Sequence, residues 1–235
     1  YAFGGNIRFR RIVSQAANIS YDSLPISLVI AFISAAVIAI QVSKEFLMTG
    51  AESYIGGTIA IVMIREIAPG FVALAIGARA GTAISAEIAN MQVTSQVDAI
   101  KTLKINPVGY YFTPRIIASA ITVPMVVLIA EFVGIMGGMF VSLGTINLNP
   151  ARYVASVWAW LATKDIYISL LKACIFGALI ALVCATKGYE TRGGAKEVGT
   201  STTQAAILST IYMLSVYTKK TANSFISAAF FITAA

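Results

Sequence analysis

The sequence contains no histidine and only 2 cysteines, and only 11% of its 235 residues are charged. Without histidine, the chain lacks the side chain that enzymes most often use as a metal ligand or a general base. Cys174 and Cys184 lie in one apolar run without a C-x-x-C pair, so no disulfide framework or metal site is predicted. These absences argue against an enzyme.

Apolar residues, in contrast, make up 58% of the chain. Soluble domains are closer to half apolar and a quarter charged. A chain with so few charged residues cannot cover a wetted surface, so lipid must cover much of it. The sequence therefore predicts an integral membrane protein.

About five apolar segments approach the roughly 20 residues that a helix needs to cross a bilayer. We predict spans at residues 24–42, 55–77, 116–143 and 166–186, and a last one that begins near residue 203. The predicted fold is thus all-α, with one transmembrane domain over residues 24–235. Lys219 and Lys220 interrupt the last segment, so we expect its helix to end, or to break and resume, near Tyr217.

The formal net charge of +7 lies mainly between the apolar segments. Lys and Arg gather in the N-terminal stretch and in the loops after the second and fourth spans, which the positive-inside rule places in the cytoplasm. The loop with Trp158 and Trp160 then faces outward. Membrane orientation explains the basic charge, so we expect no nucleic-acid partner.

Residues 1–23 predict an interfacial amphipathic helix on the cytoplasmic leaflet. Its apolar side chains recur with helical spacing, and Arg8, Arg11 and Gln15 share another face. The alternative is an ordinary amphipathic helix that packs on protein.

Residues 80–107 are too polar to span the membrane, yet they follow a helical pattern. Ile84, Ile88 and Met91 share one face, and Ser95 with Asp98 forms an S-x-x-D capping pattern that opens a second helix. Val97, Ile100 and Leu103 are expected on one side of that helix. The pattern predicts a helical hairpin, which is either a contact for a cytoplasmic partner or a solvated connector.

Arg65 and Glu66 fall near the middle of the second predicted span. Neighbouring residues on a helix point about 100° apart, so these two cannot easily neutralise each other. A charge at that depth costs at least ~2.5–3.5 kcal/mol on insertion scales, which favours a polar cavity or a partner on another helix. Pro69 removes a backbone donor beside them.

Lys172 in the fourth span and Glu131 in the third are further charges within apolar runs. Lys172 either extends to the outer interface or lines the same cavity as Glu66. Such a cavity suits an amphiphile with a charged head and fatty tails, but it equally suits a proton or ion relay. Composition leaves both open.

Several ordered motifs resemble one known family. They are R-E-x-x-P at Arg65, R-x-G-T-A-x-x-A-E-I at Arg79, M-x-V-T-S-Q at Met91 and N-P-x-x-Y-x-x-x-P-R at Asn106, followed by LLKACIFG and TRGGAKEVGTSTTQA. In this order, over about residues 26–207, they resemble the MlaE/YrbE-type permeases of MCE lipid-transport systems. That family includes the plastid lipid-import permease.

The resemblance implies a non-catalytic permease subunit of an ABC transporter that carries phospholipid or a related lipid. It implies a second copy of the chain, a cytoplasmic ATPase that binds the ATP and Mg, and an outer MCE-domain protein as partners. Arg65, Glu66 and Lys172 match polar residues of the family's lipid pocket. The hairpin matches its ATPase-coupling region, which assigns coupling roles to Glu87, Met91, Gln96 and Asp98.

No G-x-x-x-x-G-K-[ST] run occurs in the chain, so we expect it to need neither a bound cofactor nor a metal of its own. The alternative function is a proton- or ion-coupled secondary transporter that uses Arg65, Glu66, Glu131 and Lys172. We expect a bacterial inner membrane as the location, with the plastid inner envelope as the alternative.

Overall fold

The computed structural model describes residues 9–146 and 148–233, with the side chains of 11–146 and 148–218. These residues form helices and no strand. In chain order the elements are α1 (Phe9–Thr49), η1 (Glu52–Tyr54), α2 (Ile55–Val62), η2 (Met63–Val72), α3 (Ala73–Ile76), η3 (Gly77–Gly81), α4 (Thr82–Val93), α5 (Gln96–Thr102), η4 (Val108–Phe112), α6 (Thr113–Ile146), α7 (Pro150–Trp160), α8 (Thr163–Glu190) and α9 (Ala195–Thr233). Three of them, η2, η3 and η4, are π-helical.

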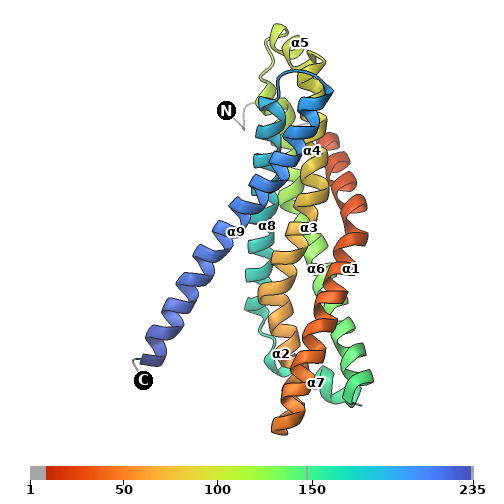
Figure 1. Ribbon diagram of the computed structural model, residues 1–235, viewed down its shortest axis with the longest axis vertical. Helices are drawn as coiled ribbons and strands as arrows, with labels where there is room; N and C mark the ends of the chain where they lie inside the picture. Colours follow the sequence, from red (N-terminus) through yellow and green to blue (C-terminus); the bar gives the residue numbers. More distant parts are fainter. Residues whose placement is uncertain (1–8, 147, 234–235) are drawn as a thin grey trace.

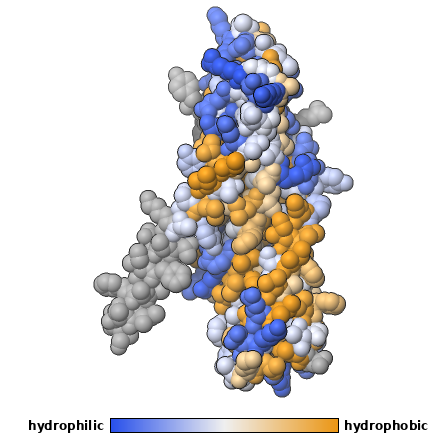
Figure 2. All heavy atoms as spheres, viewed as in Figure 1, coloured by the Kyte–Doolittle hydropathy of each residue, from blue (hydrophilic) through white to orange (hydrophobic). Residues whose placement is uncertain are grey.

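The long helices lie side by side in a bundle, with α5 at one end and α7 at the other (Figure 1). α1 packs along α6, α6 along α8, and α4 against both α8 and α9. On the face shown in Figure 2, the α5 end is largely hydrophilic, and apolar surface covers much of the other half, with a further hydrophilic patch near the α7 end. Exposed apolar side chains such as Phe132 and Phe140 suit a lipid environment.

Four segments among the described residues are long and apolar enough to cross a membrane. They are Arg11–Thr49, Glu52–Val93, Val108–Ile146 and Thr163–Glu190. They confirm the prediction of an all-α membrane protein and contain the first four predicted spans. The second joins α2, η2, α3, η3 and α4 into one rod, which continues beyond the predicted span into the hairpin.

The C-terminal region differs from the prediction in one respect. α9 is a single helix over Ala195–Thr233, so the end or break expected near Tyr217 is absent. Lys219 and Lys220 lie outside the described side chains. The fifth span, which was predicted from residue 203 onward, therefore stays a prediction.

The N-terminal helix also differs from the prediction. α1 runs without interruption through residue 23 and through Pro25, so the predicted interfacial helix over 1–23 is not a separate element where the structure describes it. Ile12 is buried, whereas Val13 is 50% exposed. A proline within a membrane helix is tolerated because neighbouring groups satisfy the freed carbonyl, which allows the helix to continue.

Paired glycines hold α2 against α7. A Cβ on Gly56 would lie 2.5 Å from the carbonyl oxygen of Tyr153, and one on Gly57 would lie 2.7 Å from the Trp160 ring. The Gly57 N–H donates to the Ser156 hydroxyl at 2.8 Å. α7 itself begins after Asn149, whose side chain accepts from the backbone of Ala151. The start of the Glu52–Val93 rod is thereby fixed at the α7 end.

Candidate functional site

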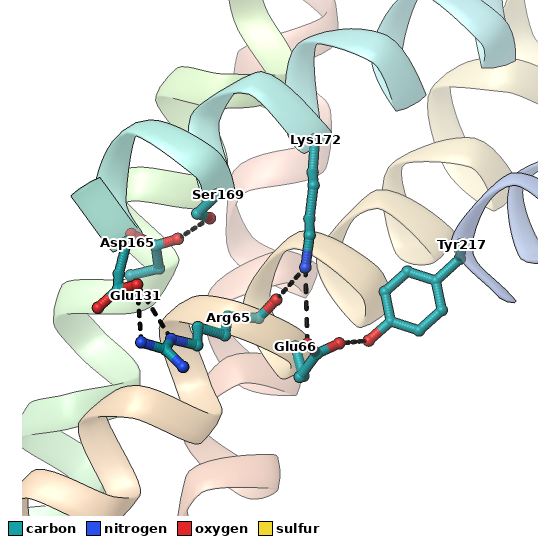
Figure 3. Close-up of polar contacts among 7 residues, drawn as sticks. All are labelled: Arg65, Glu66, Glu131, Asp165, Ser169, Lys172 and Tyr217. Atoms are coloured by element: carbon teal, nitrogen blue, oxygen red, sulfur yellow. Dashed lines mark hydrogen bonds and ion pairs between the residues drawn. The ribbon is translucent and has the colours of Figure 1, made fainter. Parts of the chain in front are cut away.

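A cavity of about 430 Å³ lies between η2, α8 and α9. Charged and apolar side chains share its wall: Arg65, Glu66, Lys164, Asp165, Ile168, Lys172, Ile175, Phe176, Val216 and Tyr217. Figure 3 shows that Arg65, Glu66 and Lys172 lie together. Lys164 and Asp165 belong to the first turn of α8, so the cavity extends toward the α7 end.

Arg65 is paired with Asp165 across two helices. Its Nε donates to Asp165 Oδ1 at 3.0 Å, and its Nη2 lies 2.9 Å from the same oxygen. The Asp165 side chain is only 4% exposed, whereas that of Arg65 is 47% exposed. The guanidinium therefore neutralises a buried carboxylate and still presents part of its surface to the cavity.

Glu66 is held by two other helices. Its Oε1 lies 3.6 Å from the Lys172 ammonium, and its Oε2 accepts a hydrogen bond from the Tyr217 hydroxyl. The side chain of Lys172 is only 12% exposed, so it lines the cavity and does not extend to the interface. Of the two positions predicted for Lys172, the structure shows the cavity.

Pro69 explains why Lys172 also binds the backbone of η2. In an α-helix the N–H of the fourth following residue would donate to the carbonyl of Arg65, and at that position Pro69 has no N–H. The Lys172 ammonium donates to this oxygen instead, at 2.6 Å. The π-helical register of η2 is a feature often found at functional sites. The carbonyl of Arg65, which lacks its α-helical donor because of Pro69, thus holds the ammonium beside Glu66.

Chemically, the cavity combines charges of both signs with an apolar wall. Arg65, Lys164 and Lys172 supply cations, and Glu66 with Asp165 supplies anions. The apolar part of the wall consists of Ile168, Ile175, Phe176 and Val216. A ligand with a charged head and an apolar body can satisfy both parts of such a wall.

Glu131 lies in a separate contact. It is 4% exposed on α6 and accepts a hydrogen bond from the Ser169 hydroxyl of α8. It does not line the cavity that contains Arg65, Glu66 and Lys172. The four charges named for an ion relay are therefore divided between two places.

The hairpin predicted for residues 80–107 is present as α4 and α5, at the opposite end from α7 (Figure 1). Gln96 and Asp98 are exposed on α5. Asp98 accepts a hydrogen bond from Lys101 at 2.8 Å, which raises the pKa of the Lys101 ammonium. Glu87 and Met91 lie farther back, on α4, and Glu87 pairs with Arg115 at 2.7 Å. Of the four predicted coupling residues, Gln96, Asp98 and Glu87 are thus exposed, and Met91 is partly buried.

Two details of the hairpin prediction are wrong. Ser95 precedes α5 but makes no side-chain cap, because its φ of 60° places it in the left-handed region that the short turn after α4 requires. Leu103 is 70% exposed, although Val97 of the same predicted face is buried. α5 is only about two turns long and ends before Leu103.

Sequence reasoning missed Asp165 and Tyr217. Asp165 lies one residue before the predicted start of the fourth span, so the sequence placed it in the preceding loop. Tyr217 lies in a segment whose helical path was uncertain because of the following lysines. A charge such as Arg65 within an apolar span favours a partner on another helix, and this expectation was the signal that could have identified Asp165.

Comparisons with known proteins identify relatives of this chain. A probable ABC transporter permease protein of Rickettsia typhi is 38% identical over 203 residues, which cover 86% of this chain and 78% of that protein. One of Synechocystis is 37% identical over 87% of this chain and 78% of its own length. The chloroplastic protein TRIGALACTOSYLDIACYLGLYCEROL 1 of Arabidopsis thaliana is 31% identical over 88% of this chain and 59% of its own.

The family comparison covers most of the chain. Residues 12–221 match the family described as Permease MlaE, and they include all four candidate membrane segments except the first residue. This match confirms the resemblance inferred from the ordered motifs. The chain belongs to the MlaE permease family.

Proposed function

We propose that the chain is the permease subunit of an ABC-type transporter that moves phospholipid or a related lipid between its membrane and an MCE-domain partner. The main support for this proposal is the composition of the 430 Å³ cavity, in which Arg65, Glu66 and Lys172 lie beside apolar side chains. A lipid head group binds the charged part, and the acyl chains contact the apolar part and the surrounding bilayer.

The position of the cavity supports exchange with a partner on the α7 side. Arg65 lies roughly 20 Å from Glu52 at about 1.5 Å per residue, and Asp165 lies in the first turn of α8. The positive-inside rule assigns the α7 end to the outer side. A lipid in this cavity is therefore closer to an outer MCE-domain partner than to the cytoplasm.

The energy source in this proposal is a separate cytoplasmic ATPase that contacts the α4–α5 hairpin. Gln96 and Asp98 are exposed at its tip and available for that contact. The relatives from Rickettsia typhi and Synechocystis are named as ABC transporter permease proteins, which supports an ATPase partner. A second copy of the chain completes the assembly, in a bacterial inner membrane or a plastid inner envelope.

Charge reversal in the cavity tests the function. In a reconstituted complex with its ATPase, we expect Glu66→Lys or Lys172→Glu to reduce ATP-dependent lipid transfer at least about tenfold, because each variant places like charges together. Assembly, measured by co-purification, is expected to persist. Lys44→Glu, an exposed residue of α1, serves as the control.

The result that would contradict the proposal is normal lipid transfer by both cavity variants in assembled complexes. The purified chain alone is expected to hydrolyse no ATP. Transfer that follows a proton gradient without nucleotide would support the secondary transporter instead.

A further inference from the structure

A second cavity, of about 340 Å³, lies at the α5 end, and it shares no lining residue with the Glu66 cavity. It lies between the first turns of α1, the end of α4, η4 and the first turn of α6. The residues that matter for its chemistry are Arg11, Ser14, Gln15, Tyr110, Tyr111 and Arg115. No acidic residue lines it among the side chains that the structure describes.

Arg11 supplies a positive charge without a carboxylate partner. Its Nη2 donates to the Tyr110 hydroxyl at 2.5 Å, and its guanidinium carbon lies 4.0 Å from the centroid of that ring. Within the described part of the chain, no ion pair includes Arg11. Tyr110 therefore orients the guanidinium without neutralising it.

Arg115 is more deeply buried, with a side chain that is 5% exposed. It reaches Glu87 through Nη2 at 2.7 Å and the carbonyl of Tyr111 through Nη1 at 3.1 Å. Its Nε is buried and has no acceptor in the structure. Leaving a buried donor of a charged group unpaired is costly, which indicates that an acceptor is missing here.

The charges around this cavity do not cancel. Glu87 offsets one of the two guanidinium groups, and its own side chain is 48% exposed. Ser14 and Gln15 add neutral donors from α1. The cavity therefore offers a surplus of positive charge and several hydrogen-bond donors, which is the composition that binds a phosphate.

The depth of the cavity along the membrane helices indicates which molecule carries that phosphate. Arg11 is the first residue of one candidate membrane segment, and Tyr110 lies in the first turns of another, Val108–Ile146. Both segments begin at the α5 end, so the cavity lies where apolar helix gives way to polar surface. This is the level of lipid head groups, and basic pockets there bind anionic lipids.

We propose that this cavity binds the phosphate of an anionic phospholipid from the adjoining leaflet, as a site separate from the Glu66 cavity. Arg11 and Arg115 contact the phosphate, and Ser14 with Gln15 contacts the rest of the head group. Met91 of α4 also lines the cavity, so the bound lipid touches the helix that leads into the hairpin. The lipid would join α1, α4 and α6 at the end where the ATPase is proposed to bind.

The test counts bound lipid and requires no transport. The full chain is placed in nanodiscs of phosphatidylcholine with a minor fraction of phosphatidylglycerol, and native mass spectrometry counts the phosphatidylglycerol that remains bound after extraction. We expect Arg11→Gln to weaken its retention about tenfold, because one charged hydrogen-bond donor group is lost. Arg152→Gln removes an equal charge from the exposed surface of α7 and should change nothing.

Two further measurements distinguish this cavity from the Glu66 cavity and a lipid phosphate from free phosphate. Lys172→Glu removes the lipid held by the Glu66 cavity, and in that background Arg11→Gln should still cause the same further loss. Millimolar inorganic phosphate should not displace the lipid from the wild-type chain. Equal retention by Arg11→Gln and the wild type, in chains of equal melting temperature, overturns the proposal. An Arg11→Gln effect that disappears in the Lys172→Glu background, or displacement by inorganic phosphate, overturns it as well.

Discussion

The Glu66 cavity and the tip of the α4–α5 hairpin hold their charges in different ways. Toward the α7 end, Arg65 pairs with Asp165, and Glu66 pairs with Lys172, so each pair joins two helices. At the tip of the hairpin, Asp98 and Lys101 are three residues apart on one short helix, and both are exposed. The first arrangement depends on tertiary packing, whereas the second needs only a local helix.

This difference separates two kinds of function. Charges that are paired between helices in a low-dielectric interior fix the relative positions of those helices, and removal of one partner is costly. Exposed pairs contribute little to stability, so their side chains are available to bind a partner protein. The comparison predicts that the cavity tolerates substitution poorly and that the hairpin tolerates it well until a partner is added.

The largest effect on stability is expected for Asp165→Ala. It leaves the Arg65 guanidinium without its partner, and we expect a loss of about 1–2 kcal/mol in the free energy of unfolding. This is less than for a fully buried pair, because the side chain of Arg65 is 47% exposed. Thermal unfolding in nanodiscs measures the change.

The matched control for Asp165→Ala is Asp98→Ala, which removes the carboxylate of an exposed pair. It should leave the melting temperature unchanged. Equal destabilisation by the two variants would show that the cavity and the hairpin tip do not differ in the way described.

Pro69→Ala is expected to change transport more than stability. The new N–H competes with Lys172 for the carbonyl of Arg65 and favours an α-helical register, which rotates Arg65 and Glu66 relative to the cavity. We expect lipid transfer to fall several-fold while the melting temperature stays equal or rises. Pro124→Ala, a helix-interior proline of α6 outside the cavity, controls for the general effect of removing a proline. Full transfer by Pro69→Ala would exclude a role for the π-helical register.

Asp98→Arg should have the smallest effect on the isolated chain. The residue is exposed, so the melting temperature should not change. If the ATPase binds the hairpin, the reversed charge should reduce its co-purification or its stimulation by lipid. Unchanged binding and activity in the complex would remove Asp98 from the proposed contact.

The sequence predicted the parts of this molecule that depend on local pattern. Long apolar runs gave the first four spans, and helical spacing of Ile84 and Ile88 gave the buried face of α4. The cost of placing Arg65 and Glu66 in a membrane predicted a polar cavity, and Lys172 is in it. These inferences need only helix periodicity and transfer free energy.

The remaining features depend on how distant helices meet. Ser169 reaches Glu131, and Tyr217 reaches Glu66, because of the particular angles at which α6, α8, α9 and η2 pack. A single sequence contains no measure of those angles. The left-handed conformation of Ser95 likewise follows from the direction in which α5 must leave α4, and a capping pattern of the same residues cannot reveal it.

Photo-crosslinking at the Glu66 cavity tests most directly whether a lipid is held there. A photoreactive amino acid replaces Ile168 of the cavity wall, and radiolabelled phospholipid is supplied in the membrane. Phe140, which is 73% exposed on α6, provides the control position. We predict that label attaches at both positions and that Lys172→Glu removes most of it at residue 168 but none at residue 140. Equal labelling at residue 168 with and without Lys172→Glu would contradict the assignment of this cavity to the lipid head group.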